Sequence, residues 1–219
     1  LSAEGVAATL RNGLHILQAA AEEDALRRAV RAGDRPGLAA QVRSIRQRYP
    51  EFASVLVVDA AGISLANSLD PGVVGRDFKD RDYYQGVLRY GKPYISPVPY
   101  VGVATRVPTL AIASPIWGSR GELRGVLAGT FTLEHLSHLL APAAVVASSR
   151  GDRGEDQGEV YLVSPSGVIL AHTDPGKRAT TVADADAGAR EALAGRRGSV
   201  TWADESERVR LGVFAPLPE

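Results

Sequence analysis

The chain has 219 residues, of which 45% are hydrophobic, so it is long enough to bury the core of one large or two small domains. Its 25 lysines and arginines balance its 25 aspartates and glutamates, which leaves no basic surface of the kind that nucleic-acid binding requires. Cysteine is absent, which excludes disulfides, thiolate catalysis and cysteine-based metal sites.

The longest segment without Asp, Glu, Lys or Arg covers residues 135–149, and it is too short and too polar to cross a bilayer. The chain begins at Leu1 within an expected helix, and it contains no methionine. We therefore expect a fragment of a longer protein, from which targeting or membrane-spanning segments have been removed.

Residues 1–32 are mostly good helix formers and predict a long N-terminal helix, which the glycines and proline of residues 33–37 end. Its apolar residues recur at alternating steps of three and four and form one stripe. The stripe suits equally well a helix packed on its own core and a stalk through which two copies form a homodimer. A second, shorter helix is expected from Leu38 to Tyr49, before Pro50.

Beyond Pro50, short β-rich runs separated by turn signals predict an antiparallel sheet. Residues 54–59 and 62–67 form the first predicted hairpin. A helix is expected next, followed by three strands and a closing helix. These five elements are expected at residues 77–89, 94–100, 109–117, 123–133 and 134–140.

The chain then repeats its own pattern. Residues 57–67 match residues 162–172 in their apolar positions and in the turn glycine, with a constant offset of 105 (162 − 57). We therefore predict two helices over residues 1–50, a first module over 51–147 and a smaller second module over 148–219 that lacks its last strand. The glycine- and charge-rich residues 148–158 are the expected linker.

Four strings of this chain carry a resemblance to a known family: residues 75–84, 91–96, 112–116 and 123–133. They resemble the membrane-distal module of double Cache sensor domains. The resemblance implies an α/β (α+β) fold with a long N-terminal helix and two PAS-like modules, each a central antiparallel sheet flanked by helices. It also implies the extracytoplasmic, periplasmic part of a bacterial inner-membrane receptor. The parent would be a sensor histidine kinase, or alternatively a chemoreceptor or diguanylate cyclase.

The segment with Arg81, Tyr83 and Tyr84 has the residue types that a carboxylate-binding pocket needs. A guanidinium offers a planar fork to two carboxylate oxygens, while tyrosines add hydroxyl donors and exclude water. The alternative is that Arg81 pairs on the surface with one of its acidic neighbours, an interaction of little energetic value. These neighbours are Asp77, Asp80 and Asp82.

In family members that bind amino acids, the arginine and the aromatic residue two positions later hold the ligand carboxylate, and an aspartate early in the last strand holds the amine. Here Thr130 stands at the aspartate position, and Arg76 replaces an expected tyrosine. The resemblance therefore favours a small organic acid over an amino acid. Tyr100, Thr109 and Arg106 are weaker candidates for the pocket, and each could equally be an ordinary strand residue.

No cofactor or metal is predicted. His135 and His138 lie three residues apart on an expected helix, but a metal site would need at least one more ligand. His172 follows the second hairpin and could line a pocket in the second module. Two other classes of function remain open: an extracytoplasmic hydrolase, which the absence of a nucleophile motif disfavours, and a dimerisation domain without a ligand.

Overall fold

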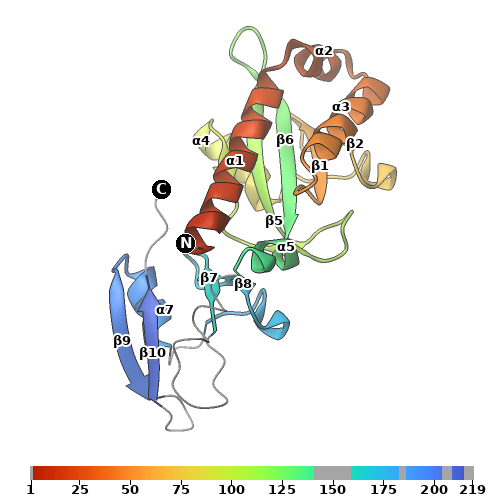
Figure 1. Cartoon of the computed structure of the whole chain (residues 1–219). Coiled ribbons are helices and arrows are strands. Elements are labelled where there is room, and N and C mark those ends of the chain that lie inside the picture. The colour runs from red at the N-terminus through yellow and green to blue at the C-terminus, as the bar shows by residue number, and fades with distance from the viewer. Residues whose placement is uncertain (1, 141–158, 183–185, 204–208, 215–219) are drawn as a thin grey trace. The chain divides into compact units, whose positions relative to one another are not determined.

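The computed structural model describes residues 2–140, 159–182, 186–203 and 209–214 (Figure 1). The chain divides into two compact units, each of which is described by itself. The larger unit comprises Ala8–His135, and the smaller unit comprises Leu1–Ala7 and Leu136–Glu219. The predicted linker, residues 148–158, lies outside the described residues. No helix in the described part of the chain is long and apolar enough to cross a membrane.

The N-terminal segment forms two helices, α1 (Ser2–Glu22) and α2 (Asp24–Ala32), and the prediction of a single long helix is wrong at one residue. Glu23 separates the helices because its backbone is extended (φ −62°, ψ 128°). The third helix, α3 (Arg35–Arg48), begins earlier than predicted. Proline is tolerated in a first helical turn, and the Asp34 side chain caps the helix by accepting from the Gly37 amide at 3.0 Å.

The larger unit contains one antiparallel sheet with the strand order β2-β1-β6-β5-β3, and β4 also pairs with β5. The predicted strand over residues 94–100 is in fact two strands of two residues each. Pro97 and Pro99 lie between them and lack the amide protons that a continuous ladder needs. The strands are β1 (Ser54–Asp59), β2 (Ser64–Asn67), β3 (Tyr94–Ile95), β4 (Tyr100–Val101), β5 (Pro108–Trp117) and β6 (Leu123–Thr132).

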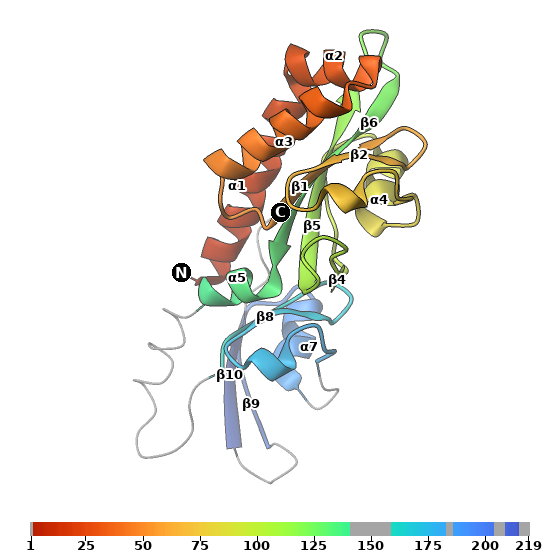
Figure 2. The same cartoon turned by 90° about the vertical axis from the view of Figure 1, so that its right-hand side faces the viewer.

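Helices cover both faces of this sheet: α1 and α3 lie on one face, and α4 (Asp82–Tyr90) lies on the other (Figure 2). On the first face α1 approaches closely at Gly13, where an added Cβ would lie 2.8 Å from the Phe131 ring. Side chains alternate between faces along a strand, so Ala128 and Thr130 of β6 point to the opposite face from Phe131. The face beneath α4 carries the candidate site.

The helix α4 begins five residues later than predicted. The residues before it form turns, in which the Asp77 carboxylate accepts from the Lys79 amide at 2.8 Å. Arg81 is the N-cap residue of α4, and Gly91 ends the helix in the left-handed conformation (φ 62°). A short helix, η1 (Pro71–Val73), precedes these turns, and α5 (Leu133–His138) follows β6.

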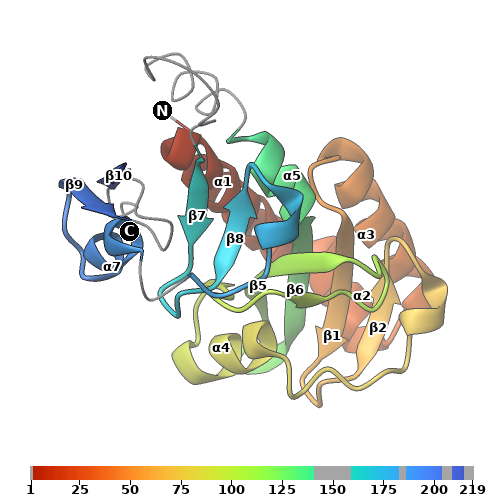
Figure 3. The same cartoon turned by 90° about the horizontal axis from the view of Figure 1, so that it is seen from below.

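The described residues of the smaller unit include two antiparallel hairpins, a short 3-10 helix and an α-helix. In backbone geometry β7–β8 repeats β1–β2 (Figure 3): the register shifts between Leu162 and Val163 as it does between Val57 and Val58. Both hairpins are followed by an Asp-Pro-Gly turn, another element of the repeat. The elements are β7 (Tyr161–Val163), β8 (Ile169–His172), η2 (Pro175–Lys177), α7 (Ala187–Leu193), β9 (Gly198–Ala203) and β10 (Val209–Phe214).

Candidate functional site

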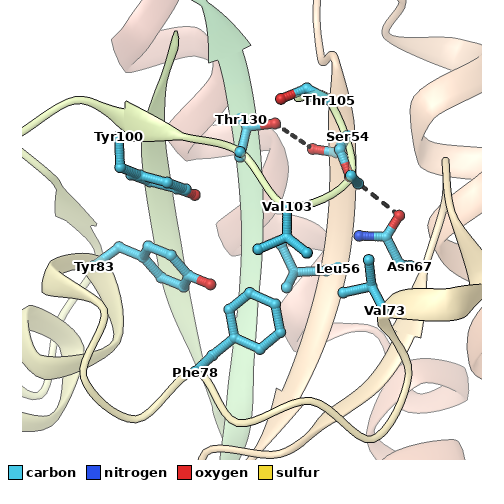
Figure 4. Close-up of a pocket in the computed structure, with 12 residues that line it drawn as sticks. Ser54, Leu56, Asn67, Val73, Phe78, Tyr83, Tyr100, Val103, Thr105 and Thr130 are labelled. Atoms are coloured by element: carbon cyan, nitrogen blue, oxygen red, sulfur yellow. Dashed lines mark hydrogen bonds between the residues drawn. The ribbon is translucent and has the colours of Figure 1, made fainter. Parts of the chain in front are cut away.

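A small cavity lies in the larger unit between the sheet and the segments that cover its α4 face (Figure 4). Its polar end comes from the strands β1, β2 and β6, its aromatic wall from Phe78 and Tyr83, and its cover from the segment 100–105. None of the described residues that line it is charged. The three strand residues with polar side chains are Ser54, Asn67 and Thr130.

Two tyrosines direct their hydroxyl groups into this cavity (Figure 4). Tyr83 and Tyr100 stack with 6.1 Å between ring centres, and Tyr83 is only 1% exposed. Burial raises the pKa of Tyr83 well above its usual value and the pKa of Tyr100 to about 12, so both phenols stay protonated. The Tyr83 hydroxyl is buried without a hydrogen-bond partner among the described residues. It is therefore a donor available to a ligand.

Asn67 supplies a second fixed donor at the polar end of the cavity. Its Oδ1 accepts from the Ser54 hydroxyl at 3.3 Å and from the backbone amides of Leu69 and Asp70 at 2.8 and 2.9 Å. These bonds fix the amide orientation and leave its NH₂ group as the donor that faces the cavity (Figure 4). Nearby, the Thr130 hydroxyl donates to the Ser54 carbonyl at 3.4 Å.

Arg81 lies beside the aromatic wall. Its guanidinium carbon is 4.7 Å from the centre of the Tyr100 ring and 6.0 Å from that of Phe78, both within cation–π range. Asp77 pairs instead with Lys79 at 3.0 Å, and Arg81 forms no ion pair within the described residues. The surface pairing considered as an alternative role for Arg81 is therefore not observed in this structure.

Three predicted residues lie elsewhere. The Tyr84 hydroxyl donates to the Ala60 carbonyl at 3.0 Å, outside the cavity. Thr109 is fully buried and donates to the Tyr100 carbonyl at 3.2 Å, which helps to hold β4. Arg106 is exposed in a turn and has a positive φ of 59°. The structure thus brings together Tyr83, Tyr100 and Thr130, with Arg81 alongside.

Sequence reasoning missed several residues that line the cavity. Most of them lie on other strands or in the covering segment, whereas Phe78 lies only three residues before Arg81. A usable signal existed for Asn67. It occupies the position in the first hairpin that His172 occupies in the second (67 + 105 = 172), and it is a buried polar residue at the end of β2. The other residues missed are Ser54, Leu56, Val73, Phe78, Gly102, Val103, Ala104 and Thr105, which line the cavity with it.

The cavity measures about 20 Å³, which is roughly the room that one water molecule needs. Its cover depends on β4, which pairs with β5 through two residue pairs, Tyr100 with Thr109 and Val101 with Pro108. So short a strand is held weakly. Movement of the covering segment would therefore break few backbone hydrogen bonds of the sheet.

The two histidines of α5 do not form a metal site in the described part of the chain, where no group of three or more suitable ligands occurs. The His135 ring stacks on Phe131 with 6.3 Å between ring centres, and His138 is exposed. His135 therefore has a packing role.

Comparisons with known proteins identify one family model and several solved structures of similar fold. The sequence profile of the Cache domain matches residues 2–218. The ligand-binding domain of the Pseudomonas fluorescens chemoreceptor CtaA, solved with L-alanine, is 18% identical with a TM-score of 0.67, covering 96% of this chain and 83% of that one. The ligand-binding domain of the Pseudomonas aeruginosa PAO1 chemoreceptor PctB, solved with L-Gln, is 19% identical with a TM-score of 0.66 (96% and 78% covered). The sensor domain of the V. cholerae histidine kinase DctB is 17% identical with a TM-score of 0.64 (84% and 67% covered).

Proposed function

The chain belongs to the Cache domain family of extracytoplasmic sensor domains, and from this membership we propose that its larger unit binds a small carboxylate ligand for a bacterial membrane receptor. The buried, unpartnered Tyr83 hydroxyl carries this proposal. Leaving such a group unsatisfied is costly, and a bound acceptor would remove the cost.

The chemistry of the cavity favours an acid without a required ammonium group. Tyr83 and Asn67 present donors, and no carboxylate lines the cavity among the described residues to neutralise an amine. Thr130 is neutral and already donates to the Ser54 carbonyl. A small organic acid thus fits this set of donors better than an α-amino acid.

Binding requires the covering segment to move outward, because a typical ligand pocket measures roughly 300 to 1,000 Å³. Movement of Tyr100 would separate its ring from Arg81 and release the guanidinium. That group could then form a bidentate pair with the ligand carboxylate. The ligand would favour the open packing, because only there can its carboxylate contact Arg81. The receptor would then have two states with different affinities for the ligand.

We infer a sensor histidine kinase as the parent protein; a chemoreceptor or diguanylate cyclase could use the same sensor.

A thermal-shift screen of organic acids and amino acids tests this function. An acid present at a hundredfold its dissociation constant should stabilise the chain by ~2.7 kcal/mol. Arg81→Ala should weaken binding by about 2 to 5 kcal/mol, since it removes one partner of a desolvated charge pair. The matched control is Arg89→Ala, which removes an exposed arginine of α4 that does not line the cavity and should leave the shift intact. A full shift in Arg81→Ala, or no acid that stabilises the wild type, would refute the proposal.

The neighbouring tyrosines offer a second matched pair of variants. Tyr83→Phe should weaken binding of the stabilising acid by about tenfold, since it deletes a donor worth ~1.5 kcal/mol, while making the free protein more stable, since it removes a buried hydroxyl without a partner. Tyr84→Phe should do the reverse: it loses the bond to Ala60, at a cost of about 1 kcal/mol in stability, and binds normally. Isothermal titration with the identified acid distinguishes the two variants, and equal affinity in both would remove Tyr83 from the site.

A further inference from the structure

A buried histidine in the smaller unit holds the turn between β8 and η2. The His172 side chain is 2% exposed, and its Nδ1 accepts a hydrogen bond from the Asp174 backbone amide at 2.7 Å. Its ring stacks on Tyr161 at 5.4 Å between centres and an interplanar angle of 11°. Its backbone amide donates to the Ser137 hydroxyl at 3.2 Å. His172 is therefore a structural acceptor as well as a titratable group.

The first hairpin performs the same task with a group that does not titrate. Asn67, 105 positions before His172, accepts from the amide two residues later, that of Leu69, at 2.8 Å. An amide oxygen accepts hydrogen bonds throughout the physiological pH range, whereas an imidazole nitrogen stops accepting once it is protonated. The two copies of the repeat thus differ in whether the side chain that accepts in the turn can be protonated.

Protonation of His172 would place an N–H group against the Asp174 amide, so that two donors face each other across the former hydrogen bond. Asp174 in turn caps η2 by accepting from the Gly176 amide at 2.8 Å. Loss of the first bond therefore disturbs the start of η2 as well as the end of β8.

Charged groups around His172 act in both directions. Glu159 lies 3.9 Å from Nε2, and it also pairs with Lys177 at 2.6 Å, which offsets its charge. Burial lowers the pKa of His172; of the weaker effects, Glu159 and Asp174 raise it, and Lys177 and Arg178 lower it. Asp186 accepts a hydrogen bond from the hydroxyl group of Tyr161, whose ring stacks on His172. On balance the imidazole is neutral at pH 7.

We propose that the smaller unit is a proton sensor, in which protonation of His172 breaks the His172–Asp174 bond and loosens the turn between β8 and η2. Because the folded-state pKa is lowered, the stability that neutral His172 contributes is complete above its ordinary value of 6.5 and is lost as the pH falls toward the folded value. Loosening of this turn would follow acidification of the medium and would not require a carboxylate ligand.

Nuclear magnetic resonance titration of the 219-residue chain from pH 8 to pH 5 tests this inference. The His172 imidazole and the Asp174 amide should shift with one common midpoint, below pH 6.5. The Leu69 amide is an internal control and should not follow that midpoint. His172→Asn introduces the residue that the first hairpin has at the equivalent position, Asn67. It should keep the fold and abolish the titration of the Asp174 amide. His138→Asn is the control and should leave both the fold and this titration unchanged. Glu159→Gln should move the midpoint to lower pH, because the carboxylate favours the protonated imidazole.

The proposal fails if the Asp174 amide does not titrate in the wild type, or if it titrates unchanged in His172→Asn. Should His172→Asn not fold, the shared midpoint in the wild type and its displacement in Glu159→Gln decide the question. Equal displacement in the Leu69 amide would assign the change to general unfolding and would also overturn the proposal.

Discussion

The two hairpins of this chain share a backbone plan and differ in chemistry. Each has the same register shift, and each ends in a side chain that accepts from the amide two residues later. The side chain is Asn67 in the larger unit and His172 in the smaller one. The turn needs a hydrogen-bond acceptor at this position, and either an amide oxygen or an imidazole nitrogen can fill that role. The residue type at this position can therefore differ between the two hairpins according to function.

The same contrast appears where each following helix begins. Asp186, 105 positions after Arg81, caps α7 by accepting from the Ala189 amide at 2.9 Å. Arg81 occupies the N-cap of α4 and makes no side-chain capping bond. An arginine has no acceptor and is a poor cap, so its presence there calls for another role. This difference supports the assignment of carboxylate binding to the larger unit.

The largest expected effect tests the packing of the two hairpins with one substitution. Val58 and Val163 are equivalent valines, but Val58 is fully buried next to β6 and Val163 is only partly buried. Val58→Ala should cost about 2 to 3 kcal/mol of unfolding free energy, from two lost methyl groups and the cavity that they leave. Val163→Ala should cost less than half of that. Urea denaturation measures both, and equal costs would break the comparison.

An intermediate effect is expected at the turn acceptor of the larger unit. Asn67→Ala should destabilise by about 2 kcal/mol, because it leaves the amides of Leu69 and Asp70 without their acceptor. Between pH 5 and pH 8 this loss should be constant, unlike the contribution of His172. Chemical denaturation across that range would show whether the two acceptors differ as proposed; a pH-dependent loss in Asn67→Ala would contradict the distinction.

The smallest effect concerns the turn after each short helix. Gly75 (φ 85°) and Ala179 (φ 61°) are equivalent, since their amides donate to Ser64 and Ile169 at 2.8 Å. A residue with a Cβ atom is strained in the left-handed conformation, and glycine is not. Gly75→Ala should therefore destabilise by about 1 kcal/mol and Ala179→Gly should stabilise by up to a similar amount. Changes of the same sign in thermal unfolding would show that the turns are not equivalent.

The sequence predicted much of the fold because its signals are local. Strand-length apolar runs and the Gly91 stop depend on neighbours along the chain, and the repeat is visible because two short segments, 105 positions apart, match within themselves. The predicted boundaries were wrong where a single extended residue or a residue without an amide proton interrupts a helix or a strand. Glu23 breaks the first helix although it has a good helix propensity, and Pro97 and Pro99 divide a strand that otherwise has β character.

The sequence alone determined the family and the repeat and predicted a site around Arg81, because these are carried by strings of adjacent residues. Only the tertiary structure decided which side chains share the cavity. Tyr84 stands next to Tyr83, yet α4 turns its hydroxyl to Ala60, while Asn67 arrives from a distant strand. Neighbours on a helix point in different directions, and a sheet joins residues far apart in sequence. The contents of the site therefore follow from packing and not from order along the chain.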